Sequence, residues 1–107
     1  MTLINDAPGA PAAIGPYSQA VRTGSLLFCS GQIPINPASG KIEATTVEAQ
    51  TEQVFANIHA LLASQGAGLS QVVKSTVFLQ HMSDFPKINP LYEAAFAGHK
   101  HARSTVQ

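Results

Sequence analysis

One long amphipathic helix is the strongest structural prediction in this 107-residue sequence. Thr45 and Glu48 have capping-box spacing: the threonine hydroxyl accepts from a free backbone N–H, and the glutamate reaches back. Gly66 supplies the left-handed residue that commonly ends a helix. Apolar residues recur between these ends at helical spacing and form one stripe: Val47, Val54, Ile58, Leu61 and Leu62. Such a stripe must be covered, so the rest of the chain is expected to supply strands that pack on it.

Four further segments are predicted as strands by their apolar or β-branched composition: residues 17–21, 25–30, 71–79 and 102–107. Residues 25–30 form a continuous apolar run closed by Gly31, which is typical of a buried strand. Thr23 and Gly24 precede this run and supply a hairpin turn. The strand before the turn is expected at an edge of the sheet.

A second helix is predicted within residues 84–96, where apolar side chains again recur at helical spacing. Asn89 followed by Pro90 is typical of a helix cap and first turn. We therefore expect a turn near residues 84–88 with the regular helix after it, or one helix bent at Pro90. With an irregular arm over residues 1–16, the order is β-β-α-β-α-β. This order predicts an α+β fold, with two helices on one face of a mixed sheet.

The charge content is low and balanced, and this argues against several classes of partner. Lys and Arg number six, Asp and Glu number six, and charged residues make up 11% of the chain. A neutral chain offers no field for a polyphosphate, so nucleic acid is not expected as a partner. No apolar run is long enough for a transmembrane helix, no secretory signal is apparent, and one cysteine cannot make an internal disulfide. We expect one cytoplasmic domain over residues 1–107, with no membrane partner and with part of its surface covered by another subunit.

The run at residues 102–107 contains one arginine, Arg103. A guanidinium is always charged, and its planar fork matches a carboxylate bidentately. An arginine on a strand is held on a stiff element, as a site for a small anion requires. The alternative is an outward-facing strand residue without a ligand.

Five blocks of sequence, in order along nearly the whole chain, resemble the Rid/YjgF family of reactive intermediate (enamine/imine) deaminases. The blocks are residues 13–21, residues 30–34 with Pro37 and Gly40, residues 73–79, Asp84 and Phe85 with Asn89 and Tyr92, and residues 102–104. The resemblance implies a chorismate-mutase-type fold, in which a ferredoxin-like sheet with two helices trimerises around a central β-barrel. The clefts of such a homotrimer lie between neighbouring subunits.

The implied activity is hydrolysis of 2-imino acids, such as 2-iminobutanoate and 2-iminopropanoate, and of their enamine tautomers to 2-keto acids and ammonia. These imines arise from serine and threonine dehydratases that use pyridoxal phosphate, so those enzymes are the implied functional partners. The imine is already electrophilic, so no cofactor is expected in the protein itself. No metal is expected either.

On this resemblance, Arg103 is expected to clamp the substrate carboxylate, and Tyr17 to donate to the planar substrate or stack on it. Four residues are expected to bind substrate: Ser30, Gly31, Asn89 and Thr105. At Gly31 the missing side chain lets a substrate approach the backbone, and carbonyl groups along residues 103–105 are candidates to orient the attacking water.

Simpler interpretations of these residues remain open from the sequence alone. Tyr17 is equally a half-buried strand aromatic, and a glycine such as Gly31 commonly marks a turn. Asn89 is most simply a helix cap. Gln19, a further candidate in the block that contains Tyr17, is more simply an exposed strand residue.

The chain departs from the family pattern at two places. Family members continue for about one more strand, which carries a glutamate proposed to place the hydrolytic water. We therefore expect a C-terminally short domain with uncovered strand edges, which binds 2-keto acids but turns imines over slowly. The usual proline before Ala102 is His101, which places a titratable group beside the arginine strand.

Other functions are also considered. The same scaffold without catalysis would be a binding protein for small carboxylates or partner enzymes, and a nuclease acting on RNA is disfavoured by the neutral charge. Cys29 is more simply a small core residue than a nucleophile. His99 and His101 alone make a poor metal site because no third ligand is apparent.

Overall fold

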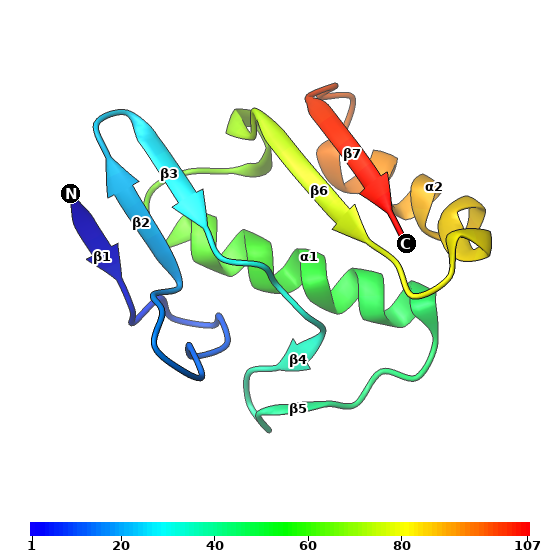
Figure 1. Ribbon diagram of the computed structural model, residues 1–107, viewed down its shortest axis with the longest axis horizontal. Coiled ribbons are helices and arrows are strands. Elements are labelled where there is room, and N and C mark those ends of the chain that lie inside the picture. The colour runs from blue at the N-terminus through cyan, green and yellow to red at the C-terminus, as the bar shows by residue number, and fades with distance from the viewer.

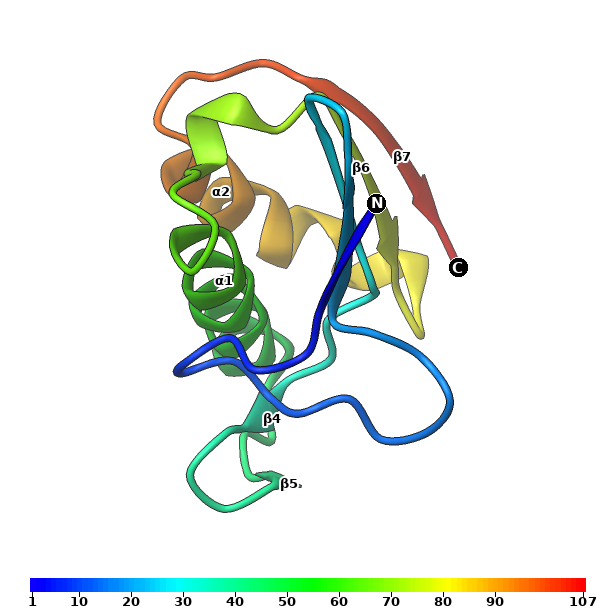
Figure 2. The same ribbon diagram turned by 90° about the vertical axis from the view of Figure 1, so that its left-hand side faces the viewer.

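The computed structural model describes residues 1–107, and both helices lie on one side of the strands (Figure 1, Figure 2). The strands are β1 Thr2–Ile4, β2 Ala20–Thr23, β3 Leu26–Cys29, β4 Ile35–Asn36, β5 Lys41–Ile42, β6 Lys74–Phe78 and β7 Ala102–Val106. The helices are α1 Val47–Ala63 and α2 Phe85–Phe96, with short 3-10 turns at Leu69–Gln71 and Met82–Asp84. The predicted α+β class, with helices on one face, is confirmed.

The strands form three separately hydrogen-bonded groups. The first three make an antiparallel sheet in the order β1-β2-β3, and β4 pairs with β5 in a two-residue ladder. The last two strands pair in parallel, with Ser75 opposite Arg103 and Val77 opposite Thr105. The chain therefore has both antiparallel and parallel strand pairs, as predicted, but in separate sheets, and β3 and β6 each have one edge without a strand partner.

Helix α1 forms where the sequence predicts it, with its start shifted by one residue. The N-cap is Thr46, not Thr45, and its hydroxyl accepts from Ala49 N at 3.1 Å. The capping-box spacing to Glu48 favoured Thr45, but the adjacent and chemically equivalent Thr46 makes the cap, so Glu48 does not complete a capping box. Gly66 has φ of +70° just past the helix, as predicted for its end.

Helix α2 corrects the predicted cap at Asn89. The helix runs without interruption from Phe85, so Asn89 and Pro90 both lie inside it. Pro90 lacks the N–H that would bond the carbonyl of Pro86, so one bond of the helical ladder is lost near the N-terminus. Burial of Ile88 and Phe96 on one face of α2 supplies the packing that keeps the helix continuous.

The core is small and lies between α1 and the first strands. Its buried residues are Ile4, Ala7, Ala20 and Leu61. A second cluster joins the helices, where the ring of Phe55 meets those of Tyr92 and Phe96 edge to face at 5.7 Å.

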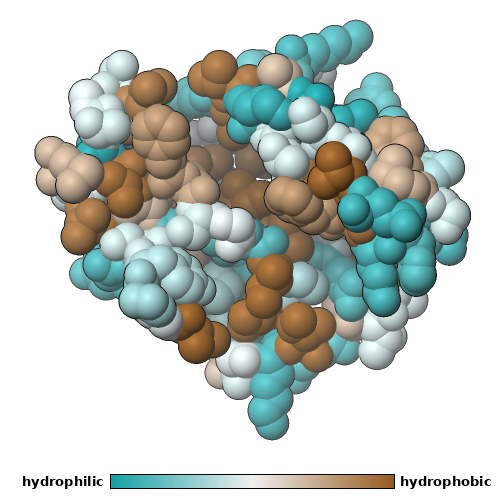
Figure 3. All heavy atoms as spheres, in the orientation of Figure 1, coloured by the Kyte–Doolittle hydropathy of each residue, from teal (hydrophilic) through white to brown (hydrophobic).

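The strand face opposite the helices is not buried, which corrects the prediction for residues 25–30. Phe28 is 61% exposed, Leu26 is 52% exposed, and Cys29 is exposed as well, so Cys29 is not a core residue. Leu27, between them, points to the core side. Large apolar side chains also lie exposed on the other strands at Leu3, Phe78 and Val106, and at Val73 just before β6. Figure 3 shows hydrophobic surface over both sets of strands, on either side of a hollow.

Three short strands were missed in segments that the sequence predicts as irregular. β1 lies in the N-terminal arm, and the β4–β5 hairpin lies in the proline- and glycine-containing loop after Ser30. Strands of two or three residues are too short for a recognisable alternation of apolar and polar side chains.

Candidate functional site

Arg103 lies on β7 with its side chain directed at α2, where three neighbours hold the guanidinium. Its Cζ is 4.7 Å from the ring centroid of Tyr92 and 5.1 Å from that of Phe85, within the range of cation–π contacts. Its Nη1 donates to Asn89 Oδ1 at 2.9 Å. We call these four residues the Arg103 cluster. The cluster holds one edge of the guanidinium and leaves its other N–H groups open to a ligand.

A cavity of about 400 Å³ opens beside the Arg103 cluster. Its wall includes Arg103, Asn89 and Tyr92, and it continues along the segment that joins α2 to β7, where His99, Lys100 and His101 contribute. The cavity wall carries the cations Arg103 and Lys100, the Asn89 carboxamide and one carboxylate, Glu93, and its positive excess suits a small anion. Thr105 lies two residues beyond Arg103 on β7, on the same face of the strand.

His101 takes part in a compact polar network behind the Arg103 cluster. Its Nε2 is 3.1 Å from Ser75 Oγ and also contacts the hydroxyl of Tyr92, and the Ser75 and Tyr92 oxygens are 2.6 Å apart. Nδ1 of the same ring is buried without a hydrogen-bond partner. Burial is the main cause that lowers the pKa of His101; interaction with the His99 backbone opposes it, and the nearby positive groups of His99 and Arg103 lower the pKa further, so the net effect favours the neutral imidazole.

A second cavity, of about 300 Å³, lies beside the N-terminal arm and contains three of the predicted residues. Tyr17, Ser30 and Gly31 all line it, together with residues 11–14 of the arm. We call these three residues the Tyr17 pocket. Tyr17 is about half exposed, and its hydroxyl accepts from Ile14 N at 3.2 Å.

Ser30 and Gly31 differ in how free they are to meet a ligand. The Ser30 hydroxyl donates to the Ser18 carbonyl at 2.6 Å, so it is already engaged in the fold. A Cβ placed on Gly31 would meet no atom within 4 Å, and its φ is not positive. The packing and backbone of the chain therefore do not require glycine at position 31.

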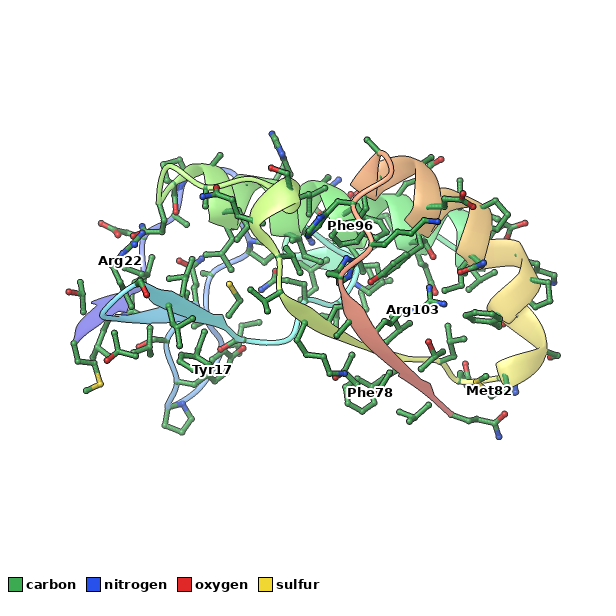
Figure 4. All side chains as sticks on the ribbon, turned by 90° about the horizontal axis from the view of Figure 1, so that it is seen from above. Tyr17, Arg22, Phe78, Met82, Phe96 and Arg103 are labelled. Atoms are coloured by element: carbon green, nitrogen blue, oxygen red, sulfur yellow. The ribbon has the colours of Figure 1, made fainter.

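The predicted residues thus form two groups that no single cavity joins. Arg103, Asn89 and Thr105 lie with β7 and α2, whereas the Tyr17 pocket lies with the N-terminal strands. Figure 4 shows Tyr17 and Arg103 on different parts of the molecule. Within one chain, Tyr17 and Arg103 do not face a common ligand.

Two buried polar residues shape the Tyr17 pocket: Gln19, considered from sequence but favoured as exposed, and Asn57, not recognised from sequence. Gln19, predicted as exposed, is buried: its Oε1 accepts from Ala7 N at 3.0 Å and its Nε2 donates to Pro11 O at 2.7 Å. Asn57 is fully buried on α1 and donates to the carbonyls of Ile33 and Ile35. Asn57 interrupts the apolar stripe of α1, and a polar residue within that stripe was the sequence signal that could have indicated its burial.

The chain belongs to the Rid/YjgF family: the family model described as Endoribonuclease L-PSP matches residues 7–107. The chloroplastic Reactive Intermediate Deaminase A of Arabidopsis thaliana is 45% identical over 98 residues, which are 92% of this chain and 52% of the relative. The predicted family is therefore confirmed, and a deaminase activity is supported at this coarse level.

Solved structures agree with the fold. A Thermotoga maritima structure is 45% identical, with a TM-score of 0.93 over 99% of this chain and 84% of the other. E. coli TdcF, solved with bound serine, is 38% identical, with a TM-score of 0.91 over 99% of this chain and 85% of the other. Neither helix of the present chain combines the length and apolar character that a membrane crossing needs.

Proposed function

We propose that this protein hydrolyses 2-imino acids, with 2-iminobutanoate and 2-iminopropanoate as substrates, to 2-keto acids and ammonia. The observation that carries the proposal is the Arg103 guanidinium, fixed over two rings and by Asn89 at the wall of an open cavity. Such a fork fits the carboxylate that these substrates carry beside the reacting carbon. The solved relative with bound serine supports a small carboxylate ligand on this fold.

For this reaction the protein mainly needs to bind the imino acid and to orient it relative to the attacking water. Water adds its oxygen to the C=N carbon, a proton passes to nitrogen, and the C–N bond breaks to release ammonia and leave the keto acid. No electron is gained or lost, and the protonated imine is already electrophilic. Holding the anion next to an oriented water is catalysis by proximity. Backbone carbonyl oxygens along residues 103–105 are proposed to accept a hydrogen bond from that water and so orient it.

We further propose that the complete site is shared between copies in a homotrimer, with the Arg103 cluster from one copy facing the Tyr17 pocket of its neighbour. Two observations support this. The two groups do not share a cavity within one chain. The outer strand face carries Phe28, Phe78 and other large apolar side chains that a neighbouring copy would cover.

The test is a pyridoxal-phosphate-dependent threonine dehydratase reaction, followed by release of 2-ketobutyrate with and without this protein. The proposal expects faster release with the wild-type protein and none of that acceleration with Arg103→Ala. Arg22→Ala is the matched control, because Arg22 bonds the Gln65 carbonyl at 3.1 Å and lines neither cavity. Equal release with wild type and with buffer would reject the deaminase.

A small-carboxylate binder without turnover is the second candidate, favoured by the same Arg103 geometry. It predicts 2-ketobutyrate binding by calorimetry with no acceleration of keto-acid release. RNA cleavage, which the family description names, is opposed by six basic against six acidic residues in the whole chain. An RNA substrate in the same assay series tests that activity directly.

The proposed setting of the protein is the cytoplasm, where the dehydratases supply the imine. Residues 1–107 are proposed to act as one domain.

A further inference from the structure

We propose that His101 is a positioning residue: through the Tyr92 hydroxyl it fixes the aromatic face on which the Arg103 guanidinium rests. The inference rests on the proposed function, in which Arg103 clamps a carboxylate, and adds a residue that never touches the ligand. The geometry that points to it is the three-way contact of His101 Nε2, Tyr92 Oη and Ser75 Oγ.

The Tyr92 side chain contacts Arg103 through its ring and the Ser75–His101 pair through its hydroxyl. Its ring centroid lies 4.7 Å from Arg103 Cζ, and the hydroxyl at its end is held by Ser75 and His101. The ring of Tyr92 also lies 4.7 Å from that of Phe96, so it is anchored by packing and by hydrogen bonds. A ring fixed at its hydroxyl has less freedom to tilt, and the cation above it has less freedom to move.

His101 is itself held in place by two neighbouring rings. Its centroid is 4.1 Å from Phe96 and 5.4 Å from His99, with the two imidazoles nearly parallel at 24°. His99 in turn is tied to the Val72 carbonyl, 2.6 Å from its Nε2. The segment between α2 and β7 therefore presents His101 at a fixed distance from Tyr92 and Ser75.

The surroundings of His101 favour its neutral form. An imidazolium carries an N–H on both ring nitrogens, whereas Nδ1 is buried without a hydrogen-bond partner, and it would place a second cation beside Arg103. The charged or titratable groups around it are Tyr92 and Glu93 of α2, His99 and Lys100 of the connecting segment, and Arg103 of β7. Only Glu93 among them would stabilise a positive charge, and Glu93 has no ion pair with His101.

The primary test is nuclear magnetic resonance of the Arg103 side chain in the protein labelled with 15N-arginine. The wild type is expected to show separate, slowly exchanging Nη signals for Arg103, because its guanidinium is restrained. His101→Leu is expected to merge them, since Leu cannot hold the Tyr92 hydroxyl. His101→Gln keeps a polar group near the position of Nε2 and is expected to restore the separation in part. Unchanged Arg103 signals in His101→Leu would overturn the proposal.

Ligand affinity gives a second readout that distinguishes this inference from the proposed function. The dissociation constant for 2-ketobutyrate is expected to rise about 2- to 10-fold in His101→Leu, the loss expected for one hydrogen bond. His59→Leu, an exposed histidine on α1, is the matched control and should bind like wild type. If the wild type does not bind 2-ketobutyrate, the proposed function fails, and the Arg103 signals alone decide whether His101 positions the guanidinium.

Tyr92→Phe keeps the ring and removes only the hydroxyl, so it tests the same link if His101→Leu does not fold. The proposal expects Tyr92→Phe to loosen Arg103 and weaken 2-ketobutyrate binding in the same direction as His101→Leu. Wild-type signals and affinity in Tyr92→Phe would show that the hydroxyl anchor does not restrain Arg103.

Discussion

The guanidinium of Arg103 can contribute to anion binding in two ways, through its charge and through its planar shape. The rings of Phe85 and Tyr92 and the Asn89 carboxamide hold the plane of the guanidinium in one orientation, so they support its planar shape and not its charge. A lysine at this position would keep the charge and lose both the fork and the stacked plane.

Arg103→Lys is therefore expected to lower kcat/KM for 2-iminobutanoate by about 10- to 100-fold, the effect of losing one charge-assisted hydrogen bond. Arg22→Lys, far from both cavities, should leave the rate unchanged. A rate within twofold of wild type for Arg103→Lys would mean that charge alone suffices and that the bidentate contact is not made.

Gly31 offers a test of the Tyr17 pocket that leaves the fold intact. A side chain there would enter open space, so Gly31→Val is expected to change the free energy of unfolding by less than about 0.5 kcal/mol. The same side chain would occupy the pocket next to Tyr17 and Ser30, so 2-ketobutyrate binding should be lost. Gly68→Val is the matched control, since its Cβ also meets nothing within 4 Å. Thermal melting and calorimetric titration measure both effects, and wild-type affinity in Gly31→Val would remove the pocket from the site.

At the scale of elements, His101 connects three of them, since it bonds Ser75 of β6 and Tyr92 of α2 and leads into β7. Its pKa is lowered in the folded protein, mainly by burial. As pH falls below the ordinary value of about 6.5, the unfolded chain therefore takes up a proton that the folded protein resists. The stability that neutral His101 contributes is present above that pH and is lost as pH falls.

The expected result is a melting temperature that decreases between about pH 7 and pH 5, with a shallower decrease in His101→Gln. His81→Gln, an exposed histidine at the turn before α2, should keep the wild-type slope. Circular dichroism melting at several pH values measures all three proteins. Identical slopes for wild type and His101→Gln would show that this imidazole is not linked to folding.

The elements that could be predicted from sequence are those with a long, repeated signal. Helix α1 has 17 residues, an apolar stripe and a threonine cap, and it is placed correctly to within one residue. For α2 the sequence left two alternatives, a late start after a cap at Asn89 or one helix through Pro90, and packing of Ile88 and Phe96 goes with the continuous helix from Phe85. Local sequence cannot weigh a cap against tertiary contacts that lie elsewhere in the chain.

The candidate site was predictable as a set of residues and not as an arrangement. The hydrogen bond from Arg103 to Asn89 joins residues 14 positions apart on different elements, and no spacing rule indicates it. The prediction that residues 25–30 are buried was wrong for a related reason. An apolar run such as that around Phe28 looks the same whether its own core or a neighbouring copy is to cover it.

At the scale of the whole molecule, the exposed apolar face makes assembly a direct expectation. Light scattering should give three times the chain mass of 11.2 kDa for the wild type. Phe28→Asp is expected to shift the protein toward the monomer and to remove turnover, because a charge would be buried against the neighbour. His59→Asp adds the same charge on the helix side and should leave the trimer intact. A stable wild-type monomer at micromolar concentration would contradict the shared site.

The parallel pairing of β6 with β7 also sets how the chain tolerates changes in length. Arg103 points toward α2 because it stands opposite Ser75, and neighbouring positions on a strand point to opposite faces. Loss or gain of one residue between Phe96 and Ala102 would leave two outcomes. Either the ladder shifts by one position, or the arginine turns away from Tyr92 to the far side of the sheet. The length of this connection therefore matters as well as its residues: insertions or deletions are expected to displace Arg103, whereas substitutions away from His101 are expected to leave its orientation unchanged.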